Sequence, residues 1–355
     1  MTTIHCIATM QGGGAEKQFC YLLRGLKLRG IGCHAVIING GVNLPLLIDS
    51  NIPIHYIKAK SFYDPNILFQ LVKLFRKIKP DLVEVWQRPM DIFGGLAAII
   101  AGIPFVAIER TDPMRFKDGI KYFLRKCITR KAKGLIANSN QGKTFWKNIL
   151  SENIKIERLP NIIDFENISS VKPVYEESFI VYVGRIHEDK NVIQLINAFS
   201  HVVVNYSNLN LYIIGEGELI NQCKLRVQEL KINNSVKFLG YVNPPYEYIK
   251  SAGIFISLSS YEGMPNTVIE AAALQVPMLL SDIPQHLDLF GEDAAFYVNK
   301  NDEAGIAAQI QFILNPENSQ LLELKKSVAY SALINNREEK VVNGYLNVYN
   351  EIIKN

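Results

Sequence analysis

The sequence of 355 residues has few cysteines and no long apolar run. Its five cysteines are scattered and form no CxxC pair, so we predict buried, reduced thiols. No apolar stretch reaches the roughly 18 residues that cross a bilayer. The N-terminal stretch MTTIHCIATMQGGG has neither a basic start nor a long apolar segment, so we expect a cytoplasmic protein without a secretory signal.

Sequence patterns for metal and nucleic-acid binding are also missing. No Asp-x-Asp sequence occurs, and the six histidines show no spacing typical of metal ligands. We therefore predict no catalytic metal and no cofactor. No recognised nucleic-acid-binding motif accompanies the basic residues, so we expect no nucleic-acid partner.

The charge, by contrast, is unevenly distributed along the chain. Residues 1–165 hold 24 Lys and Arg against 12 Asp and Glu, a net charge of +12. Because the whole chain carries +4, residues 166–355 carry −8. This difference favours two separate units, the first of which meets something negative.

Short runs rich in Val and Ile alternate with amphipathic stretches along the whole chain. IHCIATM (4–10) and DLVEVWQ (81–87) are typical of strands, and AEKQFCYLLRGLKLRG (15–30) is typical of a helix. Residues 159–178 interrupt this alternation with prolines and polar clusters, after which it restarts at 179–184. The pattern predicts two doubly wound α/β domains with parallel sheets, joined by a linker.

The first predicted strand leads into a glycine-rich turn. In QGGGAE, Gly12, Gly13 and Gly14 directly precede a helix, where glycines allow a ligand to approach the backbone and the helix N-terminus attracts an anion. The spacing does not fit the dinucleotide fingerprint, because its third glycine would fall on Lys17. The turn therefore indicates either an anion site or an ordinary tight turn.

Two cations follow the strand that opens the second half of the chain. Arg185 comes directly after Gly184, and Lys190 lies at the start of the next predicted helix. A lysine there opposes the helix dipole at a cost of about 0.3–1 kcal/mol. A bound anion would outweigh this cost, because each charge-assisted hydrogen bond contributes roughly 1.5–3 kcal/mol. The alternative is a solvated lysine beside Glu188 and Asp189.

The stretch YEGMPNTVIEAA (261–272) places two carboxylates around the start of a helix. Glu262 lies in the loop after a strand, Asn266 is predicted to cap the helix, and Glu270 falls among apolar neighbours. A buried carboxylate needs hydrogen-bond donors, which the hydroxyls of a ribose would supply. The alternative is that Glu270 occupies a narrow solvent face. Together, two cations and two carboxylates suit a nucleotide-diphosphate sugar.

With these motifs the sequence resembles the glycosyltransferases of family 4, which are retaining enzymes with the GT-B fold. The resemblance covers essentially the whole chain and includes QGGGAE, VGRIHEDKN, IIGEGE, FLGYV, SLSSYEGMPNTVIEAAA and a paired helical tail. It implies two Rossmann-like domains facing across a cleft. These are an N-terminal acceptor-binding domain (1–165), a C-terminal nucleotide-sugar-binding domain (166–335), and a last helix (336–355) that crosses back to the first domain.

The resemblance also implies roles for single residues. Arg185 and Lys190 would bind the diphosphate and offset the charge on the leaving group, and Glu262 would contact the donor sugar. Glu270 would hold the ribose. The other donor-binding residues that it implies are Gly13 and Gly14, which face the diphosphate across the cleft, Leu239 and Gly240, which frame the base, and Gly184, Gly263, Met264, Pro265, Asn266 and Thr267.

One position departs from the family pattern. Many relatives carry a histidine after the fourth strand, near the donor sugar, where this sequence reads VAIERTDP. Glu109 could orient the acceptor hydroxyl there, and Arg110 could meet a phosphate. Glu84, in VEVWQ, would also face the acceptor if its strand ends at that point.

The implied mechanism is retention by front-face attack, in which the leaving phosphate takes the proton of the acceptor. Residues 114–134 suit a membrane-bound acceptor, because they combine eight basic residues with five apolar residues that can share one helical face: Phe116, Ile120, Phe123, Leu124 and Ile128. Anionic lipid attracts such basic residues by about 1 kcal/mol each. We therefore expect peripheral binding to the inner face of an anionic membrane. The alternative is an ordinary helix with a solvated charged face.

The expected function is sugar transfer from a nucleotide-diphosphate sugar, such as a UDP-sugar, to a glycan or polyprenyl-linked oligosaccharide. Such a reaction belongs to the biosynthesis of cell-surface polysaccharides of the lipopolysaccharide, O-antigen or capsule type. Two alternatives remain open. A nucleotide-sugar epimerase with the same fold would act on the donor alone, and a non-catalytic nucleotide-sugar-binding protein would explain the absent histidine.

Overall fold

The chain divides into two units in a computed structural model that describes residues 1–111, 119–175 and 179–354. Unit 1 comprises Met1–Ile162 and Asn336–Asn355, and unit 2 comprises Ile163–Asn335. The sequence places the boundary after residue 165, whereas the structure places it after Ile162. The chain returns to unit 1 at Asn336, where the sequence places the start of the last segment.

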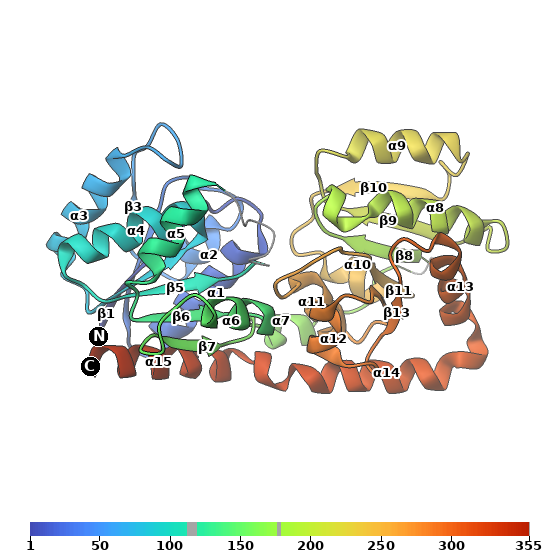
Figure 1. Cartoon of the computed structure of the whole chain (residues 1–355). Coiled ribbons are helices and arrows are strands. Elements are labelled where there is room, and N and C mark those ends of the chain that lie inside the picture. Colours follow the sequence, from blue (N-terminus) through green and yellow to red (C-terminus); the bar gives the residue numbers. More distant parts are fainter. Residues whose placement is uncertain (112–118, 176–178, 355) are drawn as a thin grey trace. The chain divides into compact units, whose positions relative to one another are not determined.

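Unit 1 is built on a parallel sheet of seven strands in the order β3-β2-β1-β4-β5-β6-β7 (Figure 1). The strands are β1 (Thr2–Cys6), β2 (Gly32–Ile37), β3 (Ile54–Tyr56), β4 (Leu82–Trp86), β5 (Phe105–Glu109), β6 (Gly134–Ala137) and β7 (Lys155–Arg158). The helices are α1 (Gly14–Leu28), α2 (Leu44–Asp49), α3 (Asn66–Ile78), α4 (Gln87–Ala101), α5 (Ile120–Thr129), α6 (Asn140–Lys147) and α15 (Glu338–Lys354).

Helices cover both faces of this sheet. One hydrophobic cluster packs α1, α2 and α15 against it, and a second packs α3, α4 and α6 against the other face. Because both faces are covered, strands such as β4 (LVEVW) and β5 (FVAIE) are buried at every position. This explains why they are almost continuous apolar runs in the sequence.

Unit 2 contains a parallel sheet of six strands in the order β10-β9-β8-β11-β12-β13. The strands are β8 (Phe179–Val183), β9 (Asn210–Ile214), β10 (Val236–Gly240), β11 (Ile254–Ser257), β12 (Met278–Ser281) and β13 (Phe296–Val298). The helices are α7 (Phe165–Ser169), η2 (Glu188–Lys190), α8 (Val192–Val203), α9 (Ile220–Glu229), α10 (Tyr246–Ser251), α11 (Asn266–Ala273), α12 (Pro284–Phe290), α13 (Glu303–Leu314), η3 (Pro316–Asn318) and α14 (Ser319–Ala332), and η4 (Leu333–Asn336) leads back to unit 1.

The sheet of unit 2 is also covered on both faces. Helices α8, α9 and α13 share one hydrophobic cluster with it, and α10, α11, α12 and α14 share the other. The prediction of two doubly wound α/β domains is therefore confirmed. The alternation in the sequence did not reveal the shortest elements, such as the three-residue strand β13, because so few residues carry no periodicity.

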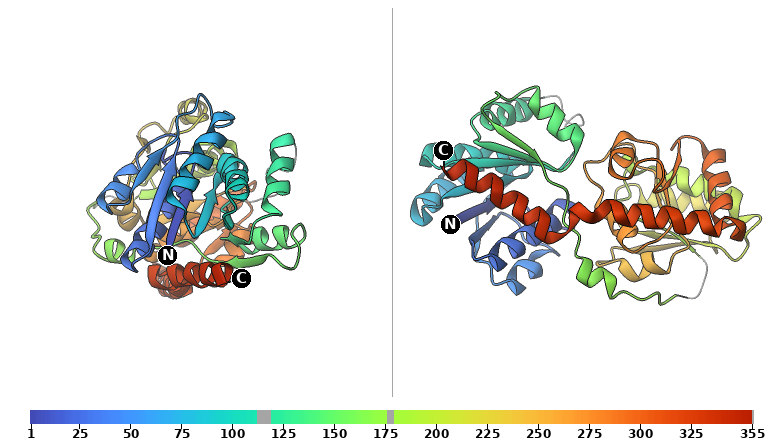
Figure 2. Two further views of the ribbon diagram at one scale, coloured as in Figure 1. Left: turned by 90° about the vertical axis from the view of Figure 1, so that its left-hand side faces the viewer. Right: turned by 90° about the horizontal axis from the view of Figure 1, so that it is seen from below.

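The last helix, α15, completes the core of unit 1. It packs against α1, where a Cβ atom on Gly25 would lie 2.6 Å from Val342, so glycine allows the two helices to approach closely. Arg24 of α1 donates to Glu338 of α15 across 2.6 Å. Figure 2 shows α15 running along the sheet of unit 1, with both chain termini at the same end of that unit. Residues at opposite ends of the sequence thus stabilise one domain.

Candidate active site

The sheet of unit 2 reverses its strand order between β8 and β11. From β8 the chain adds β9 and β10 on one side, and from β11 it adds β12 and β13 on the other. Ligands of doubly wound folds bind at the carboxyl ends of the strands at such a switch point. The two segments that leave the sheet there are 184–191 after β8 and 258–265 after β11. They contain Arg185, Lys190 and Glu262, the three residues for which the sequence implied catalytic roles.

Two glycines that follow β9, Gly215 and Gly217, allow segment 184–191 to pack closely against the backbone there. The Ile186 N–H donates to the Glu216 carbonyl across 2.9 Å. A Cβ atom on Gly215, whose φ is +133°, would lie 1.9 Å from the Gly184 carbonyl, and one on Gly217 would lie 2.1 Å from the Ile186 carbonyl. The two glycines of IIGEGE are therefore required, because a side chain at either position would overlap the backbone on either side of Arg185.

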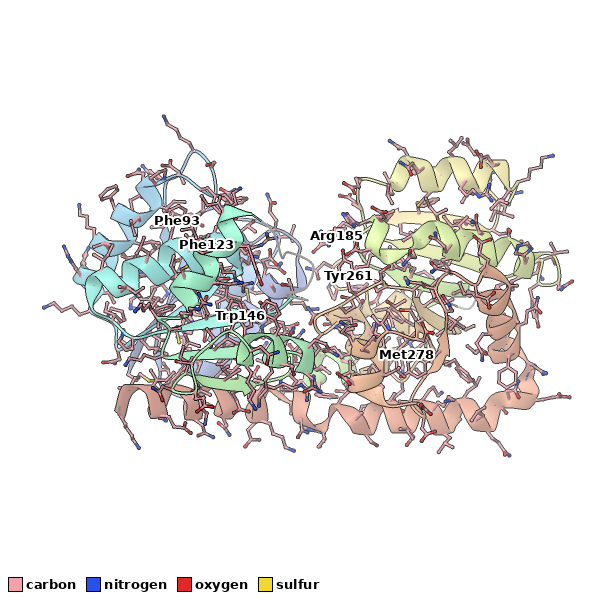
Figure 3. All side chains as sticks on the ribbon, in the orientation of Figure 1. Phe93, Phe123, Trp146, Arg185, Tyr261 and Met278 are labelled. Atoms are coloured by element: carbon pink, nitrogen blue, oxygen red, sulfur yellow. The ribbon has the colours of Figure 1, made fainter. Side chains whose placement is uncertain are left out.

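Arg185 extends from this edge of unit 2 (Figure 3). Its side chain is 57% exposed, and its guanidinium lies 4.0 Å from Asp189. The Tyr182 hydroxyl donates to the Arg185 carbonyl across 2.9 Å. The backbone of Arg185 is thus fixed, while its charged group remains accessible to an anionic ligand.

Lys190 and Glu262, which are 72 residues apart, form an ion pair in the structure. The Lys190 ammonium also contacts the Ser259 hydroxyl at 3.4 Å, and that hydroxyl donates to Glu262 across 2.7 Å. The side chains of Lys190 and Glu262 are 16% and 15% exposed, so the pair is neither buried nor freely solvated. Lys190 is therefore not a solvated lysine beside Glu188. It lies in η2, before α8 begins.

Asn191, to which the sequence analysis gave no role, joins the two segments. Its backbone has a left-handed conformation with φ 52°, which asparagine tolerates better than most residues. Its amide donates to the Leu258 carbonyl across 2.7 Å and to the Ser260 hydroxyl across 2.9 Å. The Ser260 N–H donates in turn to the Asp189 carbonyl across 2.8 Å. These bonds hold Lys190 beside Glu262.

Glu270 is buried on α11, with 7% of its surface exposed. All six residues from Val268 to Ala273 are buried, so this helix has no solvent face at that point. The prediction that Asn266 caps the helix is wrong, because α11 begins at Asn266 and Pro265 occupies the cap position without a side-chain hydrogen bond.

The other implied donor-binding residues of unit 2 lie at the ends of β10 and β11. Gly263 and Met264 lie in the loop after β11, and Thr267 lies in the first turn of α11. Leu239 and Gly240 end β10, where Gly240 has φ +68° and accepts from the Gly215 N–H across 2.7 Å.

A buried histidine on α12 helps to hold segment 258–265, which follows β11. His286 of α12 is fully buried and shares a hydrogen bond of 2.9 Å with the Ser281 carbonyl through Nδ1. The Ser281 hydroxyl donates to the Ser259 carbonyl across 2.7 Å. Burial lowers the pKa of His286, so its imidazole is neutral. This arrangement fixes Ser259, the residue that contacts both Lys190 and Glu262.

In unit 1, the structure corrects the expectation for Glu84. That expectation required the strand to end at Glu84, but β4 continues through Trp86. Glu84 is completely buried within the sheet, where its carboxylate binds His5 at 3.2 Å, the Trp86 indole and the Tyr349 hydroxyl. These contacts make it a structural residue of the core.

Glu109, at the end of β5, is also fully engaged within unit 1. One oxygen accepts from the Thr111 N–H and hydroxyl, at 3.1 and 2.9 Å. The other accepts from the Trp146 indole at 2.9 Å and lies 3.0 Å from Arg125. Arg125 also binds Asp91 across 2.6 Å, and burial raises the pKa of Asp91 to about 7. Because four donors already satisfy the carboxylate of Glu109, it is poorly suited to orient an acceptor hydroxyl.

Arg110 is held by three side chains of unit 1. Its guanidinium donates to Asn161 across 2.5 Å and to the Tyr345 hydroxyl, and it lies 4.7 Å from the centre of the Trp86 ring. These contacts join the end of β5 to α15. They favour a structural role for Arg110 rather than the phosphate contact considered from the sequence.

The glycine-rich turn of unit 1 begins helix α1. Gly13 occupies the cap position, and Gly14 is the first helical residue. A Cβ atom on Gly13 would lie 2.1 Å from a carboxylate oxygen of Glu16, so this glycine makes room for a side chain of the same turn.

Two family models match adjoining parts of the chain. Residues 12–167 match the model described as Glycosyltransferase Family 4, and residues 164–331 match the model described as Glycosyl transferases group 1. The chain belongs to glycosyltransferase family 4. This family 4 enzyme is thus a glycosyltransferase with the two Rossmann-like domains of the GT-B fold.

Relatives and solved structures of this family 4 glycosyltransferase agree with that assignment. It is 27% identical over 308 residues to the UDP-Gal:alpha-D-GlcNAc-diphosphoundecaprenol alpha-1,3-galactosyltransferase of Escherichia coli, covering 79% of this chain and 76% of that one. It is 26% identical over 308 residues to the N-acetylgalactosamine-N,N'-diacetylbacillosaminyl-diphospho-undecaprenol 4-alpha-N-acetylgalactosaminyltransferase of Campylobacter jejuni, covering 81% and 82%. The crystal structure of Anabaena Alr3699/HepE in complex with UDP and glucose has a TM-score of 0.87 at 16% identity, covering 99% of this chain and 100% of that one.

The described helices of this family 4 glycosyltransferase are too short or too polar to cross a membrane. Across residues 1–111, 119–175 and 179–354, none combines the length and the apolar character that a bilayer span requires.

Proposed function

We propose that this glycosyltransferase transfers a sugar, with retention of configuration, from a UDP-sugar to a glycan carried on a polyprenyl diphosphate. The observation that carries the proposal is the ion pair of Lys190 and Glu262 at the switch point of unit 2, beside the accessible Arg185. Two relatives whose names include a diphosphoundecaprenol-linked sugar support this choice of acceptor, and the structural neighbour in complex with UDP and glucose supports this choice of donor. The product would belong to a cell-surface polysaccharide.

The ion pair suits a site that exchanges partners when the donor binds. In the structure, Glu262 and Ser259 hold the Lys190 ammonium at the carboxyl end of β8. An entering diphosphate carries more negative charge than a carboxylate, so Lys190 would turn to the phosphate. Glu262 would then accept hydrogen bonds from hydroxyls of the donor sugar. The ion pair would thus hold the Lys190 ammonium and the Glu262 carboxylate in position until the diphosphate and the sugar hydroxyls replace their mutual contact.

The transfer step then needs stabilisation of the leaving group more than a protein base. The acceptor oxygen forms a bond to the anomeric carbon while the bond from that carbon to the phosphate oxygen breaks. The electron pair of the broken bond stays on the diphosphate, where Arg185 and Lys190 stabilise the added charge. The proton of the acceptor hydroxyl passes to the departing phosphate oxygen. We propose that these two cations replace the divalent ion that other transferases use.

The remaining donor contacts follow from the same loops. Glu270, buried on α11, would accept from the ribose hydroxyls. Leu239 and Gly240 would frame the base at the end of β10. Gly13, Gly14 and Gly184 would lie against the diphosphate, and Gly263 to Thr267 would contact the donor sugar through their backbone.

We also propose that α5 binds an anionic membrane. Three apolar side chains of α5 are exposed: Ile120 by 74%, Phe123 by 61% and Leu124 by 40%. Lys121 beside them is also exposed, and Phe123 can be found by its label in Figure 3. Arg125 does not belong to this face, because it is buried between Asp91 and Glu109. The first part of the basic segment, including residues 114–118, lies outside the described residues. A surface that combines exposed apolar and basic side chains would bring the enzyme to a lipid-linked acceptor at the inner face of the membrane.

A transfer assay tests the proposal. The purified protein is incubated with radiolabelled UDP-glucose, UDP-galactose or their N-acetylated counterparts and with GlcNAc-diphosphoundecaprenol in anionic vesicles. We expect label to move from one of the donors to the lipid fraction. Conversion of the free UDP-sugar to its epimer without transfer would instead favour an epimerase. Binding without any turnover would favour a non-catalytic binding protein.

A further inference from the structure

The sheet of unit 1 has a switch point of its own, and two polar side chains meet there. The strand order β3-β2-β1-β4-β5-β6-β7 reverses between β1 and β4. Glu16, in the first turn of α1, follows β1, and Gln87, the first residue of α4, follows β4. The Gln87 amide donates to Glu16 across 3.0 Å. The two residues thus occupy in unit 1 the position that Lys190 and Glu262 occupy in unit 2.

Glu16 is a buried carboxylate whose hydrogen-bonding capacity is not exhausted. It is 6% exposed, and burial raises the pKa of its carboxyl above the ordinary value. Within residues 1–111, 119–175 and 179–354, the donors to it are the Gln87 amide and its own backbone N–H. Since a carboxylate has about four lone-pair positions, Glu16 can accept further hydrogen bonds. Glu109, by contrast, already has four donors.

Gln87 is held in an unusual backbone conformation that directs it toward Glu16. Its φ is +66°, and it follows Trp86 of β4 without an intervening loop. A left-handed conformation is costly for a residue with a Cβ atom and persists only where surrounding structure enforces it, often at functional sites. On the other side, Gly13 leaves space for the Glu16 carboxylate. The turn after β1 and the start of α4 after β4 therefore both contribute to the position of the Glu16 carboxylate.

We propose that Glu16, held by Gln87, accepts a hydrogen bond from a hydroxyl of the acceptor sugar next to the attacking one and so positions the acceptor for attack. This inference rests on the proposed function and names the acceptor-side group that the absent histidine leaves unassigned. The attacking hydroxyl thus keeps its single hydrogen for the departing phosphate, to which the proton passes. The contribution of Glu16 is to fix the orientation of the acceptor sugar.

The experiment compares Glu16→Gln and Gln87→Ala with the unaltered protein in three measurements. These are UDP affinity by calorimetry, release of free sugar from the UDP-sugar to water, and transfer to GlcNAc-diphosphoundecaprenol. Glu16→Gln preserves the size of the side chain but weakens one hydrogen bond. We expect transfer to fall by roughly tenfold or more while UDP affinity and hydrolysis change less than twofold. For Gln87→Ala we expect a smaller loss of transfer, because the glutamate remains but is less well held.

A matched control is Glu338→Gln, since Glu338 is also a carboxylate in the first turn of a helix of unit 1 and is bound by Arg24. This variant should transfer like the unaltered protein. Equal transfer by Glu16→Gln would overturn the inference and leave the proposed function intact. Loss of UDP affinity in Glu16→Gln would also overturn it, by assigning the residue to donor binding. Absence of transfer in the unaltered protein would instead count against the proposed function and the inference together.

Discussion

Tyr349, near the end of the chain, donates its hydroxyl to Glu84 in the middle of β4. Both residues are completely buried, and they are 265 positions apart in the sequence. Glu84 also contacts His5 of β1, so the last helix, the first strand and the central strand of unit 1 share one polar cluster. The position of α15 on unit 1 is therefore specified by a hydrogen bond as well as by apolar packing.

Replacing Tyr349 by phenylalanine should destabilise unit 1. The substitution keeps the ring but removes a donor to a buried carboxylate, and we expect the free energy of unfolding to fall by about 1–3 kcal/mol. Urea denaturation monitored by circular dichroism measures this. Tyr56→Phe is the control, because Tyr56 is 56% exposed on β3 and should cost little. An unchanged midpoint in Tyr349→Phe would show that the bond to Glu84 contributes nothing.

The pair of His5 and Glu84 makes the stability of unit 1 depend on pH. Burial by itself lowers the pKa of His5, but the charge of Glu84 and hydrogen bonds to Cys33 and Glu84 outweigh it and raise the pKa to about 9. Since the unfolded value is about 6.5, the folded state binds the proton more tightly. The stabilisation is therefore fully present below pH 6.5 and is lost as the pH rises toward 9, by on the order of 3 kcal/mol.

Denaturation curves recorded between pH 6 and 9.5 check this dependence. In His5→Gln the decline over that interval should largely disappear. His201→Gln is the control, since His201 is exposed on α8 and its removal should leave the decline unchanged. A decline of equal size in His5→Gln would assign the effect to other groups.

Removing the ammonium of Lys190 should abolish most turnover without unfolding the protein. Lys190→Ala takes away a cation that would stabilise the departing diphosphate, and loss of one such group lowers kcat on the order of 10²–10³-fold. Steady-state kinetics of the transfer reaction measure the change. Lys326→Ala, at a lysine paired with Glu323 on α14, should behave like the unaltered protein. Kinetics unchanged in Lys190→Ala would remove this residue from the site.

Glu270 should act on nucleotide binding rather than on the chemical step. Glu270→Gln keeps the shape of the buried side chain but weakens its hydrogen bonds to a ribose, so the Kd for UDP should rise by about tenfold. Isothermal titration calorimetry measures this, with Glu229→Gln on α9 as an exposed control. If both variants bind UDP equally well, the ribose lies elsewhere.

The apolar residues of α5 should determine binding to membranes. Phe123→Ser combined with Ile120→Ser removes two side chains that are 61% and 74% exposed and could enter the lipid, at roughly 1.5–3 kcal/mol each. We expect co-sedimentation with anionic vesicles to fall by tenfold or more, whereas UDP affinity stays the same. Leu225→Ser, at an exposed leucine on α9, is the control. Equal sedimentation of both variants would place the membrane contact on another surface.

The pattern of residues along the chain was sufficient to predict the two α/β domains and to select candidates for the donor side. Both are local properties: strands covered on two faces must be apolar throughout, and residues that follow such strands gather at one edge of the sheet. Arg185, Lys190 and Glu262 could be proposed in this way because each lies in a segment that directly follows a strand. The ion pair of Lys190 and Glu262 fits that expectation.

The folded structure was needed to distinguish carboxylates that are structural from those that can still accept hydrogen bonds. Glu84, Glu109 and Glu16 are not distinguished by the sequence, since each lies within a predicted strand or in the segment that follows one. Their donors, however, come from distant positions: Tyr349 for Glu84, Arg125 and Trp146 for Glu109, and Gln87 for Glu16. The chemical state of a buried carboxylate depends on the groups that the fold brings to it, and no local pattern contains that information.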